Sequence, residues 1–475
     1  MRCRHTVAAL ALLASSGTAL AENPALDAFI EAELPGSAAP GLAYAALEDG
    51  AVTAKGFGER LRGSGDAVTS DTRFPIGSVT KSFTALAIMQ LVEVGVLDLE
   101  DPVSRHLPVF ADGPAAEVTL RQLLNHTSGY STVQGNRLHG GTDDAQLDLL
   151  AYAGQLARVE PVHPPGAVWR YSNANYQILG AVIEQASGER YPDYIEARIF
   201  APLGMTHSSA RMGPSSADVA TGHRPWFGSV RPGPSDAGLR VHAPAGGIVS
   251  TAHDMGLYLA MWANGVDDIV SADTKAMMLR PSGPASLHYG LGWSLDPAQG
   301  TAYHTGLVPG FETLCAFRPT EGEGVVVMVN ANSGLGFADT WYLIGGAGAR
   351  ALHEDHDDDG SRWGPKAAYL TIAALPPMFA LFAFGSWRGR AALRAKRESA
   401  AGRLSLWFPL GGMVALAWVL LKVVPGLFGG SIATMQLYQP DFAWCLIAAA
   451  ILAPAWAVQR LALAYMRESG RAPTG

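Results

Sequence analysis

Short apolar stretches alternate between strand-like and helix-like patterns in residues 22–350. The stretches 42–47, 311–317 and 324–330 are short apolar runs flanked by polar or turn residues, which predicts strands. Residues 82–96 are apolar nearly all round, and a second stretch of this kind runs from about 174 to 188, which predicts two buried helices. Strands at both ends with helices between them predict an α/β sandwich whose sheet joins the two ends of this region.

The C-terminal part follows another pattern, with long runs that carry almost no charge. Residues 367–387 hold no charged side chain over a length of about 32 Å as a helix. The runs 404–428, which includes Lys422, and 442–459 are similar. Buried helices of a soluble domain are the alternative, but three such runs with little amphipathic alternation favour three transmembrane helices. Lys422 is then expected to reach the outer interface with its ammonium group.

The N-terminus has the pattern of a secretory signal peptide over residues 1–21. Arg2 and Arg4 form a positive start, residues 7–14 are an apolar run, and Ala19-Leu-Ala21 is a small-x-small cleavage site. The run is too short to span a bilayer in the usual way, and an uncleaved anchor is the alternative. In both cases the region that follows is exported.

The parts of the chain also differ in charge. Residues 22–366 hold 22 Lys and Arg against 39 Asp and Glu, whereas residues 367–475 hold 10 against 3. These regions of −17 and +7, with Arg2 and Arg4, give the net charge of −8. Basic side chains gather in 388–403 and after residue 459, while 429–441 has none. The positive-inside rule therefore predicts that the acidic region lies outside the cytoplasm and the C-terminus inside.

Composition narrows the classes of function. Hydrophobic residues make up 48% of the chain, which excludes disorder as the dominant state, and the acidic balance argues against nucleic acid as a partner. The stretch 351–366 predicts an acidic, solvated linker. Metal ligation by His353, His356 and their acidic neighbours is the alternative, but no apolar framework would hold them, so no metal or other cofactor is expected. Cys315 has no partner for a disulfide in the exported region and is expected to be a buried structural thiol.

The first candidate for chemistry is Ser78-Val-Thr-Lys81, at the start of the first buried helix. Positions i and i+3 share one face of a helix, so the Ser78 hydroxyl and the Lys81 amine can meet. A serine needs a neighbouring base to become nucleophilic, and a lysine serves as that base when burial lowers its pKa. The helix start also places backbone N–H groups near Ser78, which suits an oxyanion. The alternative is an interfacial lysine that reaches to solvent.

Two further motifs could act together with Ser78 and Lys81 in catalysis or substrate binding. Tyr171-Ser-Asn173 supplies a phenol that could act as base toward the serine and then as acid toward a leaving group, and an amide that could hold a substrate carbonyl or the lysine. His304-Thr305-Gly306 follows a strand-like pair, and a glycine on a strand beside a cleft lets a substrate backbone approach closely. Taken singly, each motif is also consistent with a purely structural role.

Together these motifs resemble the serine β-lactamase and penicillin-binding protein superfamily over about residues 25–345, with the class C branch the most similar. The nucleophile segment is Phe74-Pro-Ile-Gly-Ser-Val-Thr-Lys-Ser-Phe-Thr84. Further motifs stand in the family's order at 123–129, 164–176, 203–205, 244–251 and 289–293. The resemblance implies an α/β, class C β-lactamase-like sandwich, with an antiparallel sheet flanked by helices and an all-helical subdomain, here over residues 22–350 and followed by the three transmembrane helices.

The resemblance also implies roles for the motif residues. Ser78 becomes the acylated nucleophile, and Lys81 and Tyr171 become the pair that handles its proton. Asn173 would orient the substrate, His304, Thr305 and Gly306 would form the strand beside it, and the backbone N–H groups of Ser78 and Leu307 would form the oxyanion hole. His126 belongs to a family packing motif.

One departure from the family matters for substrate choice. Most class C β-lactamases and carboxypeptidases carry lysine where this chain has His304, and that lysine attracts a substrate carboxylate. A neutral histidine weakens this attraction, so β-lactam hydrolysis is not expected as the main activity. A histidine here is similar to what esterase and aminopeptidase relatives use.

The combination of signal peptide, class C-like domain and three spans resembles the membrane-bound peptidases that mature colibactin and other nonribosomal peptide prodrugs. It implies a D-amino-acid-recognising peptidase in the bacterial inner membrane, with a periplasmic catalytic domain, a cytoplasmic C-terminus and His242 in the pocket. Its partners would be a small-molecule or peptide substrate and the lipid bilayer; contact with an exporter or a second copy is left open. Alternatives are a β-lactamase, D-alanyl-D-alanine carboxypeptidase or esterase of the same fold, and a non-catalytic penicillin-binding sensor. Specificity is expected in the loops 132–148 and 226–239.

Overall fold

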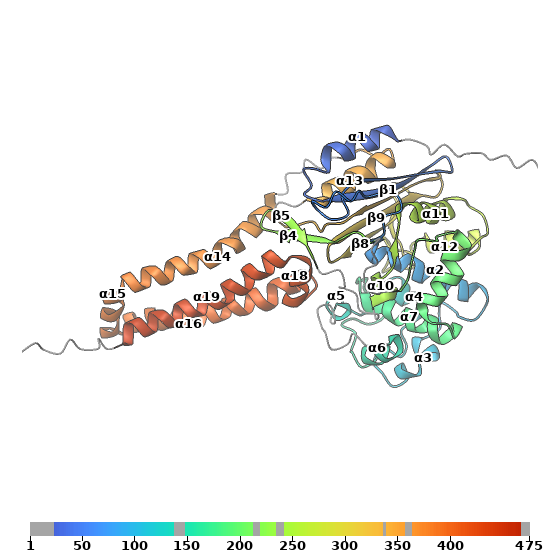
Figure 1. Cartoon of the computed structure of the whole chain (residues 1–475). Helices are drawn as coiled ribbons and strands as arrows, with labels where there is room; N and C mark the ends of the chain where they lie inside the picture. Colours follow the sequence, from blue (N-terminus) through green and yellow to red (C-terminus); the bar gives the residue numbers. More distant parts are fainter. Residues whose placement is uncertain are drawn as a thin grey trace, which may run out of the picture.

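The computed structural model describes residues 23–136, 148–211, 219–233, 242–335, 339–356 and 363–466. The predicted signal peptide lies outside these residues, as do parts of both predicted specificity loops and of the acidic linker. The described residues form an α/β domain joined to a bundle of long helices, which extends away from it in Figure 1.

A six-stranded antiparallel sheet joins the two ends of the α/β domain. Its strand order is β2-β1-β10-β9-β8-β7. The strands are β1 (Gly41–Glu48), β2 (Ala51–Gly58), β7 (Ser294–Asp296), β8 (Thr301–Val308), β9 (Phe311–Arg318) and β10 (Glu323–Val329). β1 pairs with β10 along its length, from Leu42 opposite Val329 to Leu47 opposite Gly324. The predicted strands are β1, β9 and β10, and the expected sheet between the two ends is confirmed.

Both faces of this sheet are buried, as in a sandwich. Along β10, Val325 and Val327 pack in one hydrophobic core with α1 (Pro24–Glu33) and α13 (Thr340–Ala351). Val326 and Met328 point the other way, into a larger core shared with α2 (Thr80–Glu93) and α11 (Ala252–Ala263). Successive strand side chains alternate between faces, so one short apolar strand serves two cores. Figure 1 shows α1 and α13 together on one side of the sheet.

A helical subdomain packs beyond α2. It is centred on α7 (Asn173–Ser187) and includes α3 (Val103–His106), α4 (Leu120–Leu124), α5 (Thr132–Gly135), α6 (Leu149–Leu156) and α8 (Tyr191–Ile195). The two predicted buried helices are α2 and α7, and 11 of the 14 residues of α2 are buried. α2 ends before the predicted residue 96 because Gly95 takes a positive φ of 72°.

Smaller elements complete the domain and frame the site. They are β3 (Phe74–Pro75) with β6 (Val249–Ser250), the hairpin of β4 (His223–Trp226) and β5 (Ser229–Pro232), the short helical turn η1 (Gly77–Val79), α9 (Ala201–Leu203), α10 (Ala243–Gly246) and α12 (Ala272–Met278).

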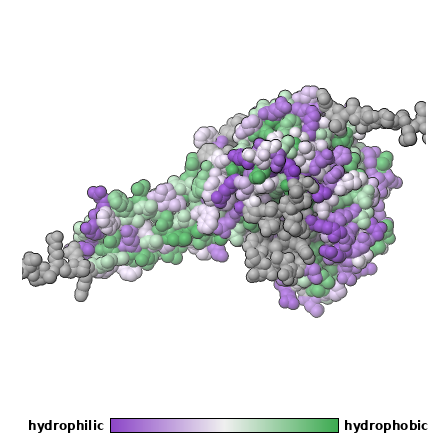
Figure 2. All heavy atoms as spheres, viewed as in Figure 1, coloured by the Kyte–Doolittle hydropathy of each residue, from purple (hydrophilic) through white to green (hydrophobic). Residues whose placement is uncertain are grey.

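The C-terminal bundle contains three helices that are long and apolar enough to cross a membrane. α14 (Trp363–Arg388) is followed by α15 (Arg390–Ala395), then α16 (Ala400–Trp418), which continues through a π-helical turn into α17 (Val424–Leu427), and finally α19 (Pro440–Tyr465). The predicted runs 367–387, 404–428 and 442–459 fall on these three helices. Figure 2 shows hydrophobic residues gathered over the bundle surface.

The connection between the second and third of these helices rests on the α/β domain. It contains the short helix α18 (Ile432–Tyr438). The buried Asp441 carboxylate accepts hydrogen bonds from Phe227 N at 2.9 Å and Tyr369 Oη at 2.8 Å. Arg224 donates to the carbonyl oxygens of Gln436 and Leu437 at the end of α18. These bonds fix the connection against the β4–β5 hairpin.

Candidate active site

The turn η1 holds Ser78 tightly against strand β8. Gly77 has a φ of 54°, and a Cβ added there would lie 2.6 Å from the Leu307 nitrogen. A Cβ added to Gly306 would lie 2.0 Å from the Ile76 carbonyl oxygen. Only glycine at both positions permits this approach, because any larger residue would push the turn off the strand. The approach brings the backbones of Ser78 and Leu307 together, as an oxyanion hole made of their N–H groups would require.

Lys81 lies beneath Ser78, one helical turn further along and with 0% of its surface exposed. Its Nζ is 3.0 Å from Ser78 Oγ and donates to Asn173 Oδ1 at 2.7 Å and to the Ala245 carbonyl oxygen at 2.6 Å. Burial holds the pKa of Lys81 well below the ordinary lysine value. A buried amine with a lowered pKa can exist neutral and accept the serine proton.

Tyr171 lies on the other side of the nucleophile, immediately before α7. Its hydroxyl is close enough to Ser78 for the serine to lower its pKa, which acts against the larger effect of burial, and Lys81 Nζ lies 4.9 Å from the ring centroid. Burial raises the pKa of the Tyr171 hydroxyl, so this phenol keeps its proton at neutral pH. The geometry therefore suits Tyr171 as a proton donor or relay and Lys81 as the base.

The buried His126 supports Tyr171 from below. The two ring centroids are 4.5 Å apart. His126 Nδ1 faces Ser172 N at 3.2 Å and Asn175 Nδ2 at 3.0 Å, both donors, so it accepts from both. The packing role expected for His126 thus places it directly under the tyrosine of the site.

His304 is buried behind Tyr171 on β8, with 3% of its surface exposed and ring centroids 6.2 Å apart. Its Nδ1 lies 2.8 Å from the Thr305 carbonyl oxygen, which can only accept, so Nδ1 carries the proton. Its Nε2 therefore accepts from the Tyr289 hydroxyl at 3.1 Å. Burial, aided by the nearby Lys81, lowers the pKa of His304 to about 3. The imidazole is neutral at physiological pH.

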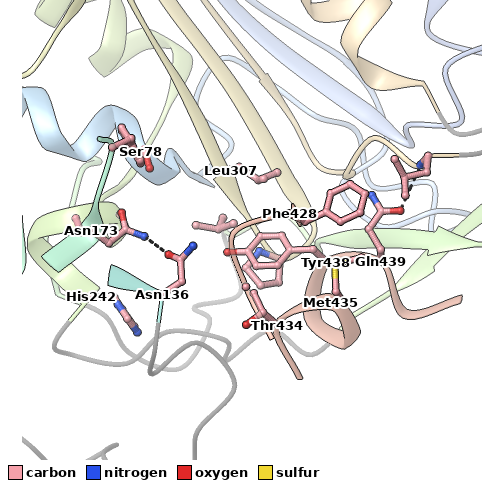
Figure 3. Close-up of a pocket in the computed structure, with 17 residues that line it drawn as sticks. Ser78, Asn136, Asn173, His242, Leu307, Phe428, Thr434, Met435, Tyr438 and Gln439 are labelled. Atoms are coloured by element: carbon pink, nitrogen blue, oxygen red, sulfur yellow. Dashed lines mark hydrogen bonds between the residues drawn. The ribbon is translucent and has the colours of Figure 1, made fainter. Parts of the chain in front are cut away.

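A cavity of about 350 Å³ opens above Ser78, and its wall comes from two parts of the chain (Figure 3). The α/β domain contributes Ser78, Asn136, Tyr171, Asn173, His242, Ala245, Gly246, Leu307, Val308, Pro309 and Leu335. The connection between α17 and α19 contributes Phe428, Gly430, Thr434, Met435, Tyr438 and Gln439. None of these lining side chains is Asp, Glu, Lys or Arg, so the described part of the cavity wall holds no carboxylate, ammonium or guanidinium group.

The structure brings most of the predicted site residues together. Ser78, Tyr171, Asn173, Leu307 and His242 line the cavity, and Lys81 lies directly below it. His242 is 8% exposed and its Nδ1 accepts from Gln177 Nε2 at 2.6 Å. His304, Thr305 and Gly306 do not line the cavity; they form the strand behind it.

Sequence reasoning missed the wall made by α18. Residues 429–441 were noted only for their lack of basic residues. The signal was present in the spacing, because Thr434, Met435 and Tyr438 stand at i, i+1 and i+4 and share one face of a helix. Asn136 was also missed as an individual residue, although it lies in a predicted specificity loop.

A serine against a buried amine and a phenol, beside an antiparallel sheet, is typical of serine hydrolases that work through an acyl-enzyme. A family model described as Beta-lactamase matches residues 26–349. The chain belongs to the beta-lactamase family, and its resemblance to the serine β-lactamase and penicillin-binding protein superfamily is confirmed. The match ends before α14, so the three long apolar helices lie outside the family region.

Individual relatives cover the same region. Protein flp of Staphylococcus aureus (strain NCTC 8325 / PS 47) is 28% identical over 326 residues, which are 65% of this chain and 63% of flp, so the chain spans less than two thirds of that relative. The octameric penicillin-binding protein homologue from Pyrococcus abyssi is 30% identical with a TM-score of 0.60, over 70% of this chain and 78% of that one. A D-stereospecific amidohydrolase from Streptomyces sp. is 26% identical with a TM-score of 0.53, over 66% and 95%.

Proposed function

We propose that this protein is a membrane-anchored serine hydrolase of the periplasm that cleaves an uncharged amide or ester through an acyl-enzyme at Ser78. Its preferred substrate would be an N-acyl-D-amino-acid amide, as in prodrug maturation. The observation that carries this proposal is the contact of Ser78 Oγ with Lys81 Nζ at 3.0 Å, on the floor of a cavity whose described lining residues include no Asp, Glu, Lys or Arg. The family membership supports serine chemistry, and the cavity wall supports the class of substrate.

In the first half-reaction, the neutral Lys81 amine takes the proton of Ser78 Oγ as this oxygen attacks the substrate carbonyl. The carbonyl oxygen becomes an oxyanion that accepts from the backbone N–H groups of Ser78 and Leu307. Tyr171 gives its proton to the leaving amine and regains one from the Lys81 ammonium. The products are an ester on Ser78 and the free amine.

In the second half-reaction, a water molecule attacks this ester and gives its proton to the Lys81 amine, directly or through Tyr171. The second oxyanion collapses, the bond from the acyl carbon to Ser78 Oγ breaks, and Oγ recovers a proton. The acid is released and each group returns to its initial protonation state.

The charge of the site supports an uncharged substrate. The neutral His304 replaces the cation that carboxylate-binding relatives carry, and burial disfavours the cationic form of Lys81. A substrate carboxylate would lose its hydration in the cavity without gaining an ion pair with any of the described lining residues. An uncharged acyl chain has no such hydration to lose, and Leu307, Leu335 and Phe428 offer it apolar surface. The D configuration rests on similarity to the Streptomyces amidohydrolase.

The bundle supports the membrane part of the proposal. α14, α16–α17 and α19 are the three candidate spans, and the first two are almost entirely exposed to their surroundings over the apolar stretch. Exposed apolar helix surface of this extent is stable in lipid and not in water. The basic residues between α14 and α16 support a cytoplasmic position for that end of the bundle, and the cavity would then lie on the opposite side of the membrane.

A pair of substrates tests this function on the full-length protein in lipid nanodiscs. We expect a long-chain N-acyl-D-asparagine amide to be hydrolysed faster than nitrocefin, a β-lactam that bears a carboxylate. Ser78→Ala should abolish hydrolysis and labelling by a fluorophosphonate probe. Full labelling of the Ser78→Ala variant would refute the nucleophile, and faster turnover of nitrocefin would restore the β-lactamase alternative. Labelling of the wild type without turnover would instead favour a sensor.

A further inference from the structure

Three side-chain amide and amine groups connect the nucleophile to the membrane bundle in one hydrogen-bonded chain. Lys81 Nζ donates to Asn173 Oδ1 at 2.7 Å. Asn173 Nδ2 donates to Asn136 Oδ1 at 2.8 Å, a bond visible in Figure 3. Asn136 Nδ2 donates to the carbonyl oxygen of Gly429 at 2.9 Å. Gly429 stands just after α17, in the connection that leads to α18.

The direction of every bond in this chain is fixed from the Gly429 end. A backbone carbonyl can only accept, so Asn136 must turn its NH₂ group toward Gly429 and its oxygen toward Asn173. Asn173 must then turn its own NH₂ group toward Asn136, which leaves its oxygen facing Lys81. With either asparagine rotated by half a turn, two donors or two acceptors would face each other.

The same logic decides where the lone pair of Lys81 points. A neutral amine has two N–H donors and one lone pair. Asn173 Oδ1 takes one donor and the Ala245 carbonyl oxygen takes the other, at 2.7 and 2.6 Å. The third neighbour is Ser78 Oγ, at 3.0 Å, so the lone pair faces the serine hydroxyl and is placed to take its proton. If Asn173 presented its NH₂ group instead, the lone pair of Lys81 would be drawn toward that donor and away from the serine.

We propose that Asn136 is a positioning residue that orients the Asn173 amide, and through it the Lys81 amine, by its bond to the Gly429 carbonyl of the bundle connection. This inference rests on the proposed function, since it concerns the base of that reaction. It makes docking of the connection between α17 and α18 part of the catalytic geometry. Asn136 acts through Asn173 and does not itself handle the proton.

The test is the pH dependence of fluorophosphonate labelling, measured on the full chain in lipid nanodiscs and separated into the maximal rate kinact and the probe affinity KI. Asn136→Leu removes both bonds, so kinact should fall roughly tenfold to hundredfold with little change in KI, as expected for a misplaced catalytic group. Loss of a well-aligned acceptor also lowers the pKa of Lys81, so the acidic limb of the profile should move to lower pH.

Asn136→Asp gives the opposite signature in the pH profile. A carboxylate still accepts from Asn173 but cannot donate to Gly429, and its negative charge raises the pKa of Lys81. Here kinact should also fall, but the acidic limb should move to higher pH. Asn136→Gln keeps the amide and should recover part of kinact. Thermal unfolding shows whether Asn136→Leu folds. If it does not, Asn136→Asp and Asn136→Gln provide the test.

The matched control is Arg224→Met, which removes the bonds to the Gln436 and Leu437 carbonyl oxygens. These two bonds lie at the far end of α18, and the variant leaves the Asn136–Gly429 bond and the rest of the amide chain in place. We therefore expect kinact and the pH profile to stay within about twofold of the wild type. A wild-type pH profile in both Asn136→Leu and Asn136→Asp would overturn the inference, as would a changed KI with an unchanged kinact. An equal shift in Arg224→Met would do the same. Failure of wild-type labelling, by contrast, would refute the proposed function.

Discussion

At the scale of single residues, burial is the first cause of the protonation states around the nucleophile. It lowers the pKa values of Lys81, His126 and His304 and raises that of Tyr171. Burial thus favours the neutral form of all four side chains. A site of neutral groups can move one proton among them without stabilising a charged substrate, which agrees with the lack of Asp, Glu, Lys and Arg among the described lining residues of the cavity.

Because His304 is buried in its neutral form, we expect the folded protein to lose stability in acid. Its pKa is about 3 in the folded protein and about 6.5 when unfolded, so below pH 6.5 unfolding takes up a proton and becomes more favourable as the pH falls. This residue should lower the free energy of unfolding by up to about 1.4 kcal/mol per pH unit between pH 6.5 and 3. His304→Gln should flatten the fall of the thermal midpoint between pH 6.5 and 4.

His288 supplies the control for this prediction, because its side chain is exposed. His288→Gln should leave the dependence of the thermal midpoint on pH as it is in the wild type. Parallel curves for the wild type and His304→Gln would show that His304 does not titrate in this way. Buried His126 contributes in the same direction, so some slope remains in the variant.

The sequence could predict residues whose spacing is local and whose chemistry belongs to a recognisable motif. Ser78 and Lys81 share one helical turn, and Tyr171 and Asn173 lie at one helix start. The tautomer of His304 could not be predicted, because it depends on hydrogen bonds to the Thr305 carbonyl oxygen and the Tyr289 hydroxyl. The role proposed for Asn136 could not be predicted either, because it depends on the carbonyl oxygen of Gly429, which is 293 residues away.

At the scale of elements, the short helix α18 has more influence on the site than its length suggests. Ser431 and Thr434 form a capping box at its start. Gln439 Nε2, just past its end, donates to the Ser333 carbonyl oxygen at 2.6 Å. With both ends fixed, α18 presents Thr434, Met435 and Tyr438 to the cavity as a wall and not as a loose loop.

The apolar wall predicts a dependence of the reaction on acyl-chain length. Phe428 lines the cavity and is 52% exposed, so Phe428→Ala should disturb the fold little. It should raise KM for long-chain N-acyl substrates by about fivefold to tenfold, the equivalent of one or two buried methylene groups. KM for an N-acetyl substrate should stay nearly unchanged. Steady-state kinetics across a series of chain lengths measures this.

Phe408→Ala is the matched control, because Phe408 lies on α16 away from the cavity and is 74% exposed. It should leave KM unchanged at every chain length. If Phe428→Ala raises KM equally for short and long substrates, the residue does not contact the acyl chain. If Phe428→Ala changes KM for none of the substrates, the acyl chain binds elsewhere and not against Phe428.

Elements with strong patterns were predicted well, and α18 was not. β1, β9, β10, α2 and α7 are long or apolar enough for their residues to reveal them. α18 has seven residues and mixes Thr434 and Gln436 with apolar side chains, which is also typical of a loop. Its helical form depends on the capping box and on docking against the α/β domain, and such tertiary stabilisation is invisible in a short window of sequence.

At the scale of the whole molecule, the bundle and the α/β domain form one continuous structure. Asp441, at the start of α19, accepts hydrogen bonds from Phe227 on the β4–β5 hairpin and from Tyr369 on α14. The cavity lies next to this junction, since α18 contributes to both. In the proposed orientation the cavity opens close to the outer surface of the bilayer, where an acylated substrate would be concentrated.

Cysteine labelling tests that orientation. Gln299 on the α/β domain and Glu398 between α15 and α16 are both exposed, whereas the described cysteines, Cys315 and Cys445, are buried. In spheroplasts, Gln299→Cys should react with a membrane-impermeant maleimide, and Glu398→Cys should react only after permeabilisation. The reverse pattern would invert the topology, and equal labelling of both would exclude a spanning bundle. The wild type measures the background.

The pairing of β1 with β10 determines the order in which this protein can assemble. Gly41 and Asn330 hydrogen-bond across that seam from positions 289 residues apart. During synthesis, β1 and β2 must therefore wait with an open edge until almost the whole domain has emerged, which makes folding slow and exposes it to aggregation. α14 follows soon after β10, so sheet closure overlaps with membrane insertion. Because α18 comes later still, the nascent chain completes its cavity wall only after the first two helices of the bundle have been synthesised.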